Sequence, residues 1–470
     1  MENDLLNEQY QGFAEGNREM LDTLMKALTA GSGVDTASFT SGRAMTPESL
    51  DTTLVNVLWD QNEAVLFKAL KKQPVKSPVH QYARRTGVGD GDGAWVAEGG
   101  NSFEKDQSLE RVNVTMKFLQ TLRKATLQAT ITTMLEDAIT SEKMAGTLWL
   151  IKQVESILFD GDSANVTEEP DGLRALIWAK RATITKGNII DVHGKDASSK
   201  EFEDAVNEGA RVIRGKFGMP TDLYTSLIVM EDVQKLIRDR MRFPADKSGV
   251  ILPTMVFDAY PTPFGKLSLR PDLFLLERGI PVTGSLTEKP SQVTLATVLT
   301  PADAANSNFK AADAGEYYYA VSAVSKFGES VVSSEIQCSG LAAGDKVTIE
   351  ITAGATAGTA YKIFRNKLGA GSSALKYHVG TIPAGTSGTA HSVDWNDWMP
   401  GCSDAFMLGM APMYDAIEWE QFLPMMKFDL YPTNAAVYPF LLLLFGALAV
   451  KKPEQQVIIR NIAPSKLGWF

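Results

Sequence analysis

The hydrophobic and polar positions follow different periods along the chain, and the clearest pattern lies close to the C-terminus. An apolar run extends from Ala435 to Val450, interrupted only by Pro439 and Gly446, and a short run follows at 457–459. A strand that is covered on both faces has an uninterrupted apolar sequence. We therefore predict that this stretch supplies central strands of a sheet. A membrane-spanning helix needs about 20 apolar residues, so the shorter run favours a buried strand.

Earlier in the chain, apolar residues recur at three- and four-residue steps, which is typical of helices packed on a core. The helices predicted in this way cover 133–159, 202–217 and 231–240. The short strands predicted between them are 227–230, 256–257 and 266–269. Strands that alternate with helices indicate a mixed α+β class for this part of the chain.

The N-terminal region shows a helical pattern over 5–28, followed by a segment rich in Ser, Thr and Gly up to Met45. Such a linker composition favours an extended, flexible chain. Two interpretations stay open for the chain up to Met45: a mobile terminus, or an arm that wraps onto a neighbouring subunit.

The segment 75–124 predicts a long hairpin that protrudes from the rest of the molecule. Two extended runs, 76–85 and 109–122, flank a glycine-rich tip at 87–93. Along the second run, alternate apolar residues share one predicted face. A lone hairpin is marginally stable in water, so we expect it to lie on another subunit. The candidate inter-subunit contact residues are Arg84, Arg85, Trp95, Val112, Val114, Met116 and Phe118.

The composition changes after Gly279, and 281–400 is rich in Thr, Ser, Ala and Gly with no helical period. Short alternating segments separated by turn signals predict a β-sandwich. These segments are 316–325, 346–351, 360–365, 377–382 and 391–395. The α/β pattern stops at Leu276 and resumes near Ala411, so the module is predicted to be inserted. Its predicted core residues are Tyr317, Tyr319, Val321, Ile349, Ile351, Ile363 and Trp395. The tyrosine-rich strand and the following Phe-Gly-Glu-Ser resemble immunoglobulin-like and fibronectin type III modules.

Charge and candidate chemistry narrow the function classes. The formal net charge of -10 disfavours broad binding to a nucleic-acid backbone. Two cysteines and four scattered histidines predict neither a disulfide framework nor a histidine metal site. The acidic turns at 90–92 and 160–165 lack the ligand spacing of a calcium loop. No nucleophile elbow or phosphate-binding loop is present. We predict a non-enzyme with no catalytic residue, metal or cofactor, and the polar N-terminus predicts no secretory signal peptide.

Two short motifs carry a resemblance to a known family. The first is Gly446-Ala-Leu-Ala-Val450 followed by Lys451, Lys452, Pro453 and the 457–459 strand. The second is the Gly161-Asp162 turn after the long helix, followed by Pro170-Asp-Gly-Leu173. Together with the order of elements, they resemble the major capsid proteins of tailed bacteriophages, which share the Hong Kong-type capsid fold.

The resemblance implies an organisation for the whole chain. The expected parts are an N-terminal arm (1–74), an extended-loop hairpin (75–124), a peripheral domain with a spine helix (125–172), an axial domain (173–280), an inserted immunoglobulin or fibronectin III-like β-sandwich (281–400), and a return to the axial and peripheral domains (401–470).

The implied function is a structural capsid protein that self-assembles into hexamers and pentamers, forming an icosahedral shell around phage DNA. The implied partners are further copies of itself, portal, scaffold or decoration proteins, and packaged DNA without sequence-specific contact. The implied location is the virion, with assembly in the host cytoplasm and no membrane contact. The alternative is a surface-binding protein whose inserted module binds glycan or protein. An enzyme with a site assembled from distant loops is a third possibility.

Overall fold

The computed structural model describes residues 63–89, 95–101, 104–132, 137–178, 187–240, 259–275, 287–411, 413, 415–432 and 435–465. The chain divides into two units, Met1–Val57 and Leu58–Phe470, and the described residues belong to the second. The predicted helix at 5–28, most of the glycine-rich tip and the predicted strand at 256–257 lie outside them.

The C-terminal apolar run forms a long strand at the centre of a four-stranded sheet. The strand order is β1 (Lys71–Pro74), β18 (Ile417–Asp429), β19 (Val437–Val450) and β4 (Lys117–Thr126). β19 runs antiparallel to both of its neighbours. The predicted central strand is therefore confirmed, but its predicted burial on both faces holds only from Gly446 onward. Between Pro439 and Phe445, buried and partly exposed side chains alternate, so one face is open there.

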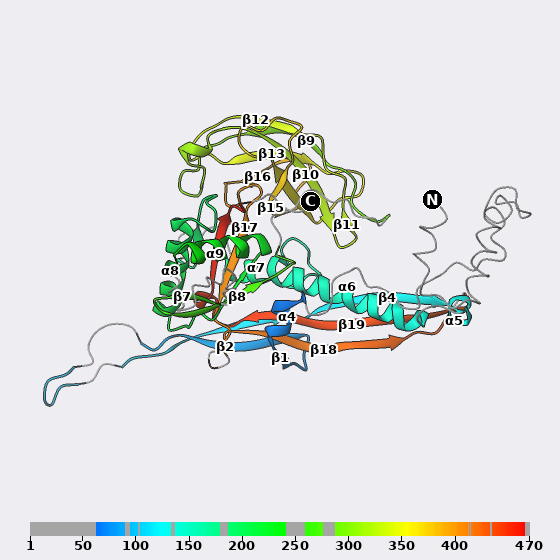
Figure 1. Cartoon of the computed structure of the whole chain (residues 1–470), viewed down its shortest axis with the longest axis horizontal. Helices are drawn as coiled ribbons and strands as arrows, with labels where there is room; N and C mark the ends of the chain where they lie inside the picture. Colours follow the sequence, from blue (N-terminus) through cyan, green and yellow to red (C-terminus); the bar gives the residue numbers. More distant parts are fainter. Residues whose placement is uncertain are drawn as a thin grey trace, which may run out of the picture. The chain divides into compact units, whose positions relative to one another are not determined.

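The long helix α6 (Ala138–Asp160) lies along one face of this sheet (Figure 1). It starts at Asp137, whose carboxylate accepts a hydrogen bond from the Thr140 N–H at 3.0 Å, as an N-cap residue does. It ends where Gly161 and Gly172 pack backbone on backbone, joined by a 2.8 Å hydrogen bond. A Cβ on Gly161 would lie 2.4 Å from the Pro170 carbonyl oxygen, so only glycine fits this close approach. The Gly161-Asp162 turn and the Pro170-Asp-Gly-Leu173 segment therefore form one structural feature.

A six-stranded sheet is the largest sheet among the described residues. Its strand order is β5 (Ile189–Asp191), β20 (Val457–Ile462), β17 (Ser403–Leu408), β6 (Asp222–Thr225), β8 (Gly265–Pro271) and β7 (Ala259–Thr262). The helices α8 (Lys200–Gly215) and α9 (Leu227–Arg240) contribute to the core on this sheet. The short helices are α4 (Val65–Ala69), α5 (Leu127–Ile131) and α7 (Leu173–Ile177).

Two predictions for this region are wrong. The predicted strand at 227–230 is the first turn of α9, and the strand is β6, just before it. A four-residue apolar run fits a helical turn as well as a strand. Ser226 favours the helix, because its hydroxyl accepts a hydrogen bond from the Val229 N–H at 3.4 Å, as an N-cap residue does. The chain also re-enters the six-stranded sheet at Ser403, earlier than the predicted return near Ala411.

Residues 287–400 form two smaller sheets that share one hydrophobic core. One sheet contains β11 (Gly328–Glu329), β10 (Gly315–Ser325), β14 (Ala360–Arg365) and β15 (Tyr377–Pro383), with β12 (Ile336–Leu341) also paired to β10. The other contains β16 (Thr389–Asp394), β13 (Val347–Thr352) and β9 (Thr294–Leu299). Strands lie at all five predicted places. The predicted core residue Trp395 is only half-buried and donates to Asp303, whereas Trp398 belongs to the core.

Charged and aromatic side chains join this β-rich region to the six-stranded sheet. Arg460 of β20 is buried between Asp191, at 3.2 Å, and Asp397, at 3.5 Å. The rings of Trp178 and Trp398 meet edge to face at 5.0 Å. The ring nitrogen Nε2 of His193 lies 3.1 Å from the Asp313 carboxylate. The β-rich region is therefore held to the rest of the chain by several specific contacts.

Candidate assembly surfaces

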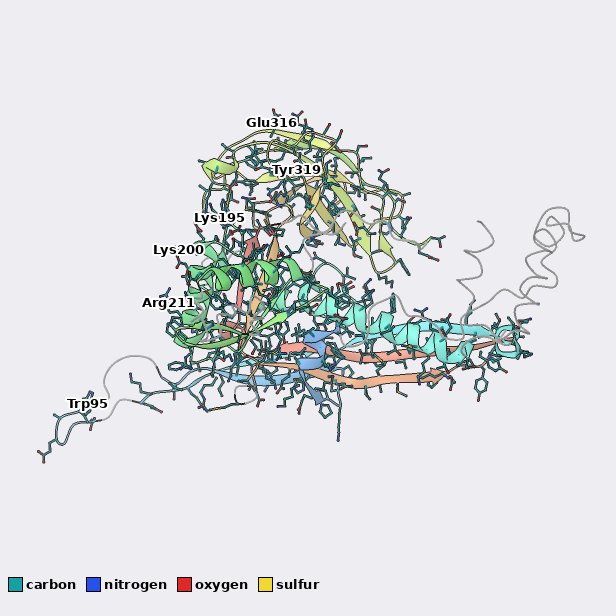
Figure 2. The ribbon with its side chains drawn as sticks, viewed as in Figure 1. Trp95, Lys195, Lys200, Arg211, Glu316 and Tyr319 are labelled. Atoms are coloured by element: carbon teal, nitrogen blue, oxygen red, sulfur yellow. The ribbon has the colours of Figure 1, made fainter. Side chains whose placement is uncertain are left out.

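The predicted hairpin exists as a two-stranded sheet of β2 (Val79–Gly87) and β3 (Ser108–Thr115), paired antiparallel. Trp95 lies beyond both strands at the end of the hairpin (Figure 2) and is 96% exposed. Its exposure agrees with the contact role expected from the sequence, which stays a prediction.

The structure corrects the predicted second strand of the hairpin. The run 109–122 is two strands, β3 and β4, which separate at Met116. Met116 is only 1% exposed, and its N–H donates to the Pro78 carbonyl oxygen at 2.8 Å. Its side chain is therefore part of the chain's own core and is not available to a neighbouring subunit.

The remaining candidate residues lie on three different surfaces. Val112 and Val114 pair with Tyr82 and His80, and they share the half-buried face of the hairpin. Phe118 is 58% exposed but belongs to the four-stranded sheet. The predicted common face for these apolar residues is wrong, because the break at Met116 separates the two sheets.

The two arginines also differ from each other. Arg84 is on the half-buried face and pairs with Glu110 across the hairpin at 2.7 Å. Arg85 is on the opposite, exposed face and pairs in register with Leu109. Arg85 thus presents its charge outward, whereas Arg84 is already neutralised within its own chain.

An apolar face on the four-stranded sheet is the surface that sequence reasoning missed. It lies opposite the face covered by α6, and its residues are brought together by the register of β4, β18 and β19. Phe118 and Phe445 meet edge to face at 4.9 Å, and Leu122 is 60% exposed. We call it the open sheet face; its members are Phe118, Leu122, Met426, Phe428, Leu441, Leu443 and Phe445.

The open sheet face had a signal in the sequence. Met426 and Phe428 alternate with Lys427, which is the pattern of a strand with two different faces. The continuous apolar run of β19 hid this alternation, because both of its faces are apolar whether they are covered or not. Contiguous exposed apolar surface of this kind makes the open sheet face a candidate interaction site.

Glu155 of α6 and Asp272, which follows β8, are two neighbouring buried carboxyl groups. Glu155 accepts hydrogen bonds from the backbone N–H groups of Leu66 and Phe67, at 2.7 and 2.9 Å. Burial, together with a hydrogen bond to Asp272, raises the pKa of Glu155 to about 9. Burial also raises the pKa of Asp272. Through these contacts the two residues connect α4, α6 and the end of β8. Both are almost completely buried, so a substrate has no access to them.

A cavity of about 260 Å³ lies between α6, the start of β4 and the turn at 166–170. Its lining contains no Ser, Cys or His. Glu168 at its rim pairs with Lys326 at 3.3 Å. Among the described residues, no group of three or more His, Cys, Asp or Glu side chains could hold a metal ion. Within the same residues, no helix is long and apolar enough to cross a membrane.

Comparison with known proteins finds relatives that align with this chain over almost its whole length. The sequence matches no family model. It is 25% identical over 473 residues to the major capsid protein of Staphylococcus phage K, covering 97% of this chain and 98% of that protein. It is 26% identical over 455 residues to the putative major capsid protein of Enterococcus phage phiEF24C, covering 94% and 95%.

Solved structures are also similar over most of their length. The capsid of the native GTA particle has a TM-score of 0.48 and 9% identity, covering 92% of this chain and 100% of that chain. The SrpI encapsulin from Synechococcus elongatus PCC 7942 has a TM-score of 0.42 and 8% identity, covering 92% and 98%.

Proposed function

We propose that this chain is a major capsid protein, a structural subunit of which many copies form a phage shell. The observation that carries the proposal is the extent of the match to the Staphylococcus phage K protein, which leaves almost no part of either chain unpaired. A match of this extent covers the hairpin, the long helix, the six-stranded sheet and the C-terminal strands together.

The open sheet face and the hairpin support a role in self-assembly. Covering apolar surface stabilises an association by roughly 25 cal/mol per Å² of apolar area removed from water. The open sheet face and Trp95 are both available for this in the single chain. We propose that they lie within contacts between subunits, together with Arg85 at the outer face of the hairpin.

The finer organisation is part of the same proposal. We infer a Hong Kong-type fold with an arm at 1–74, an extended loop at 75–124, a peripheral domain at 125–172, an axial domain at 173–280 and a return at 401–470. The segment 281–400 is proposed as an inserted immunoglobulin or fibronectin III-like β-sandwich, which is supported by its two sheets on one core.

The proposed partners follow from this role. They are hexamers and pentamers of the chain itself, other head proteins such as portal, scaffold or decoration proteins, and DNA inside the shell. The proposed location is the virion, after assembly in the host cytoplasm. Because the net charge is -10, contact with packaged DNA is expected to be local and independent of sequence.

Negative-stain microscopy of the purified full-length chain tests the proposal. We expect closed shells or rings of capsomers, and light scattering should show large particles at high protein concentration. A folded chain that stays monomeric at high concentration contradicts the proposal. If that monomer bound glycans through 281–400, the alternative of a surface-binding protein would replace it.

A further inference from the structure

A buried acid lies at the root of the hairpin. Glu420 of β18 is completely buried, and neither of its carboxylate oxygens has a hydrogen-bond partner among the described residues. Its Oε1 lies 3.8 Å from Nε2 of His80 in β2 and 4.0 Å from Nζ of Lys451. A buried carboxylate without hydrogen bonds is costly, so its ionised form depends on these two neighbouring charges.

Lys451 pairs mainly with a second carboxylate, that of Glu418. Lys451 makes its closer contact with Glu418, which also pairs with Lys71 at 2.9 Å. Burial raises the pKa of Glu420, while His80 and Lys451 act in the opposite direction. His80 is therefore the neighbour whose charge remains for Glu420. The other titratable and charged groups around this site are Lys71, Tyr82, Arg84, Glu110, Asp415 and Glu418.

The contact between His80 and Glu420 crosses from the hairpin to the four-stranded sheet. A second contact crosses at the same root, where the Tyr82 hydroxyl donates to the Val450 carbonyl oxygen at 3.3 Å. The first contact depends on the charge of an imidazole, whereas the second is a hydrogen bond from a phenol. Imidazole side chains change charge between about pH 5 and 8, where phenols stay neutral.

We propose that His80 and Glu420 form a pH-sensitive latch that fixes the root of the hairpin on the four-stranded sheet. When His80 is protonated, an imidazolium faces the buried carboxylate and the latch is closed. As the pH rises and the proton leaves, Glu420 keeps only the longer contact to Lys451, and the hairpin root is released. The latch belongs to the single chain; only its use in setting the hairpin before it meets a neighbour rests on the proposed function.

Hydrogen exchange on the monomeric fraction of the full-length chain tests the latch. Amide protection of 79–87 and 108–115 is compared at pH 5.5 and pH 7.5, with intrinsic exchange rates corrected for pH. We expect protection about tenfold higher at pH 5.5, a ratio equivalent to about 1.4 kcal/mol. Protection of 457–462, in the six-stranded sheet, serves as the internal reference.

Three variants separate the latch from a general loosening of the hairpin. His80→Gln and Glu420→Gln should each abolish the difference between the two pH values. Tyr82→Phe removes the other root contact, so it should lower protection equally at both pH values and leave their ratio unchanged.

Equal protection of the wild-type hairpin at both pH values overturns the latch, and this comparison needs no variant to fold. A His80→Gln chain that keeps the wild-type ratio overturns it as well. Because exchange is measured on the monomer, a failed latch leaves shell formation untouched, and failed shell formation leaves the latch intact.

Discussion

The β-rich region at 287–400 and the four-stranded sheet differ in how their buried charges are paired and in how far their apolar side chains are exposed. In the β-rich region, the buried Arg365 is matched by Asp394 at 2.6 Å and Asn396 at 2.7 Å, and Tyr319 also donates to Asp394. In the four-stranded sheet, one face is covered by α6, which carries Glu155 of the buried carboxyl pair with Asp272, and the other face leaves seven apolar side chains open.

This difference indicates which of the two regions is stable without a partner subunit. A region whose buried charges are paired and whose two sheets share their own buried core needs no partner for its stability. A sheet with an open apolar face has a surface that a partner can cover. We therefore expect changes in the first region to affect folding of the chain and changes at the open sheet face to affect association.

The largest expected effect concerns the carboxyl pair. Because the pKa of Glu155 is raised to about 9, the folded chain holds a proton that the unfolded chain releases above its ordinary value of 4.5. This stability is fully present below pH 4.5 and is lost as the pH rises towards 9. The free energy of unfolding should fall by up to about 1.4 kcal/mol per pH unit within this window.

Urea unfolding between pH 5 and 9 measures this dependence. Glu155→Gln should flatten it, because an amide has no proton to release. Glu142→Gln is the matched control, since Glu142 is on the same helix but exposed and paired with Arg123 at 3.6 Å. A Glu155→Gln chain with the wild-type slope would contradict the assignment.

The second effect concerns the buried cation of the β-rich region. Arg365→Ala leaves the Asp394 carboxylate buried without its cation, which costs about 3–5 kcal/mol. Scanning calorimetry should show the transition of this region at a much lower temperature, with a smaller change elsewhere. Lys362→Ala on the same strand is the control, since the Lys362 side chain is 37% exposed where it pairs with Glu329, and its loss should cost about 1 kcal/mol. Equal losses from the two variants would refute the comparison.

The third effect concerns the open sheet face. Phe118→Glu places a charge where an apolar contact with another copy is proposed, so it removes a burial of about 1.5–3 kcal/mol per contact and adds a desolvation cost. We expect wild-type thermal stability of the monomer and loss of large particles in light scattering. Leu375→Glu, at a similarly exposed position of the β-rich region, should assemble normally. Normal assembly of the Phe118→Glu chain would show that this face is not a contact.

The sequence predicts those parts of the fold that have one strong local period. The long helix, α8 and the alternating strands at 315–394 were all found at the predicted places, because their apolar spacing matches a single regular structure. The predictions failed where a short apolar run fits two structures, as at Leu227, and where a regular alternation continues across a break, as at Met116. Such breaks depend on which distant strands pair with each other, and a local sequence pattern carries no information on that pairing.

The candidate surfaces were predicted only in part for the same reason. Trp95 and Arg85 are as exposed as the hairpin prediction requires, because they lie on a segment with few contacts. The open sheet face could not be assembled from local patterns, since it combines residues of β4 with residues of β18 and β19, which lie far from β4 in sequence. The joint of Arg460 with Asp191 and Asp397 was missed as well, because it combines residues that are more than 60 positions apart.

The smallest expected effect is at the hairpin surface. Arg84 and Glu110 are both partly exposed, so Arg84→Ala should cost about 1 kcal/mol or less in the free energy of unfolding. Because that arginine is already paired within its own chain, its removal should also leave assembly almost unchanged. Arg85→Ala is the matched comparison: its charge faces outward, so its effect should appear in assembly and weaken as salt is raised. Light scattering of the two variants at low and high salt measures the contrast. If Arg84→Ala impaired assembly more than Arg85→Ala, the half-buried face of the hairpin would be the contact, and the roles assigned to its two faces would be reversed.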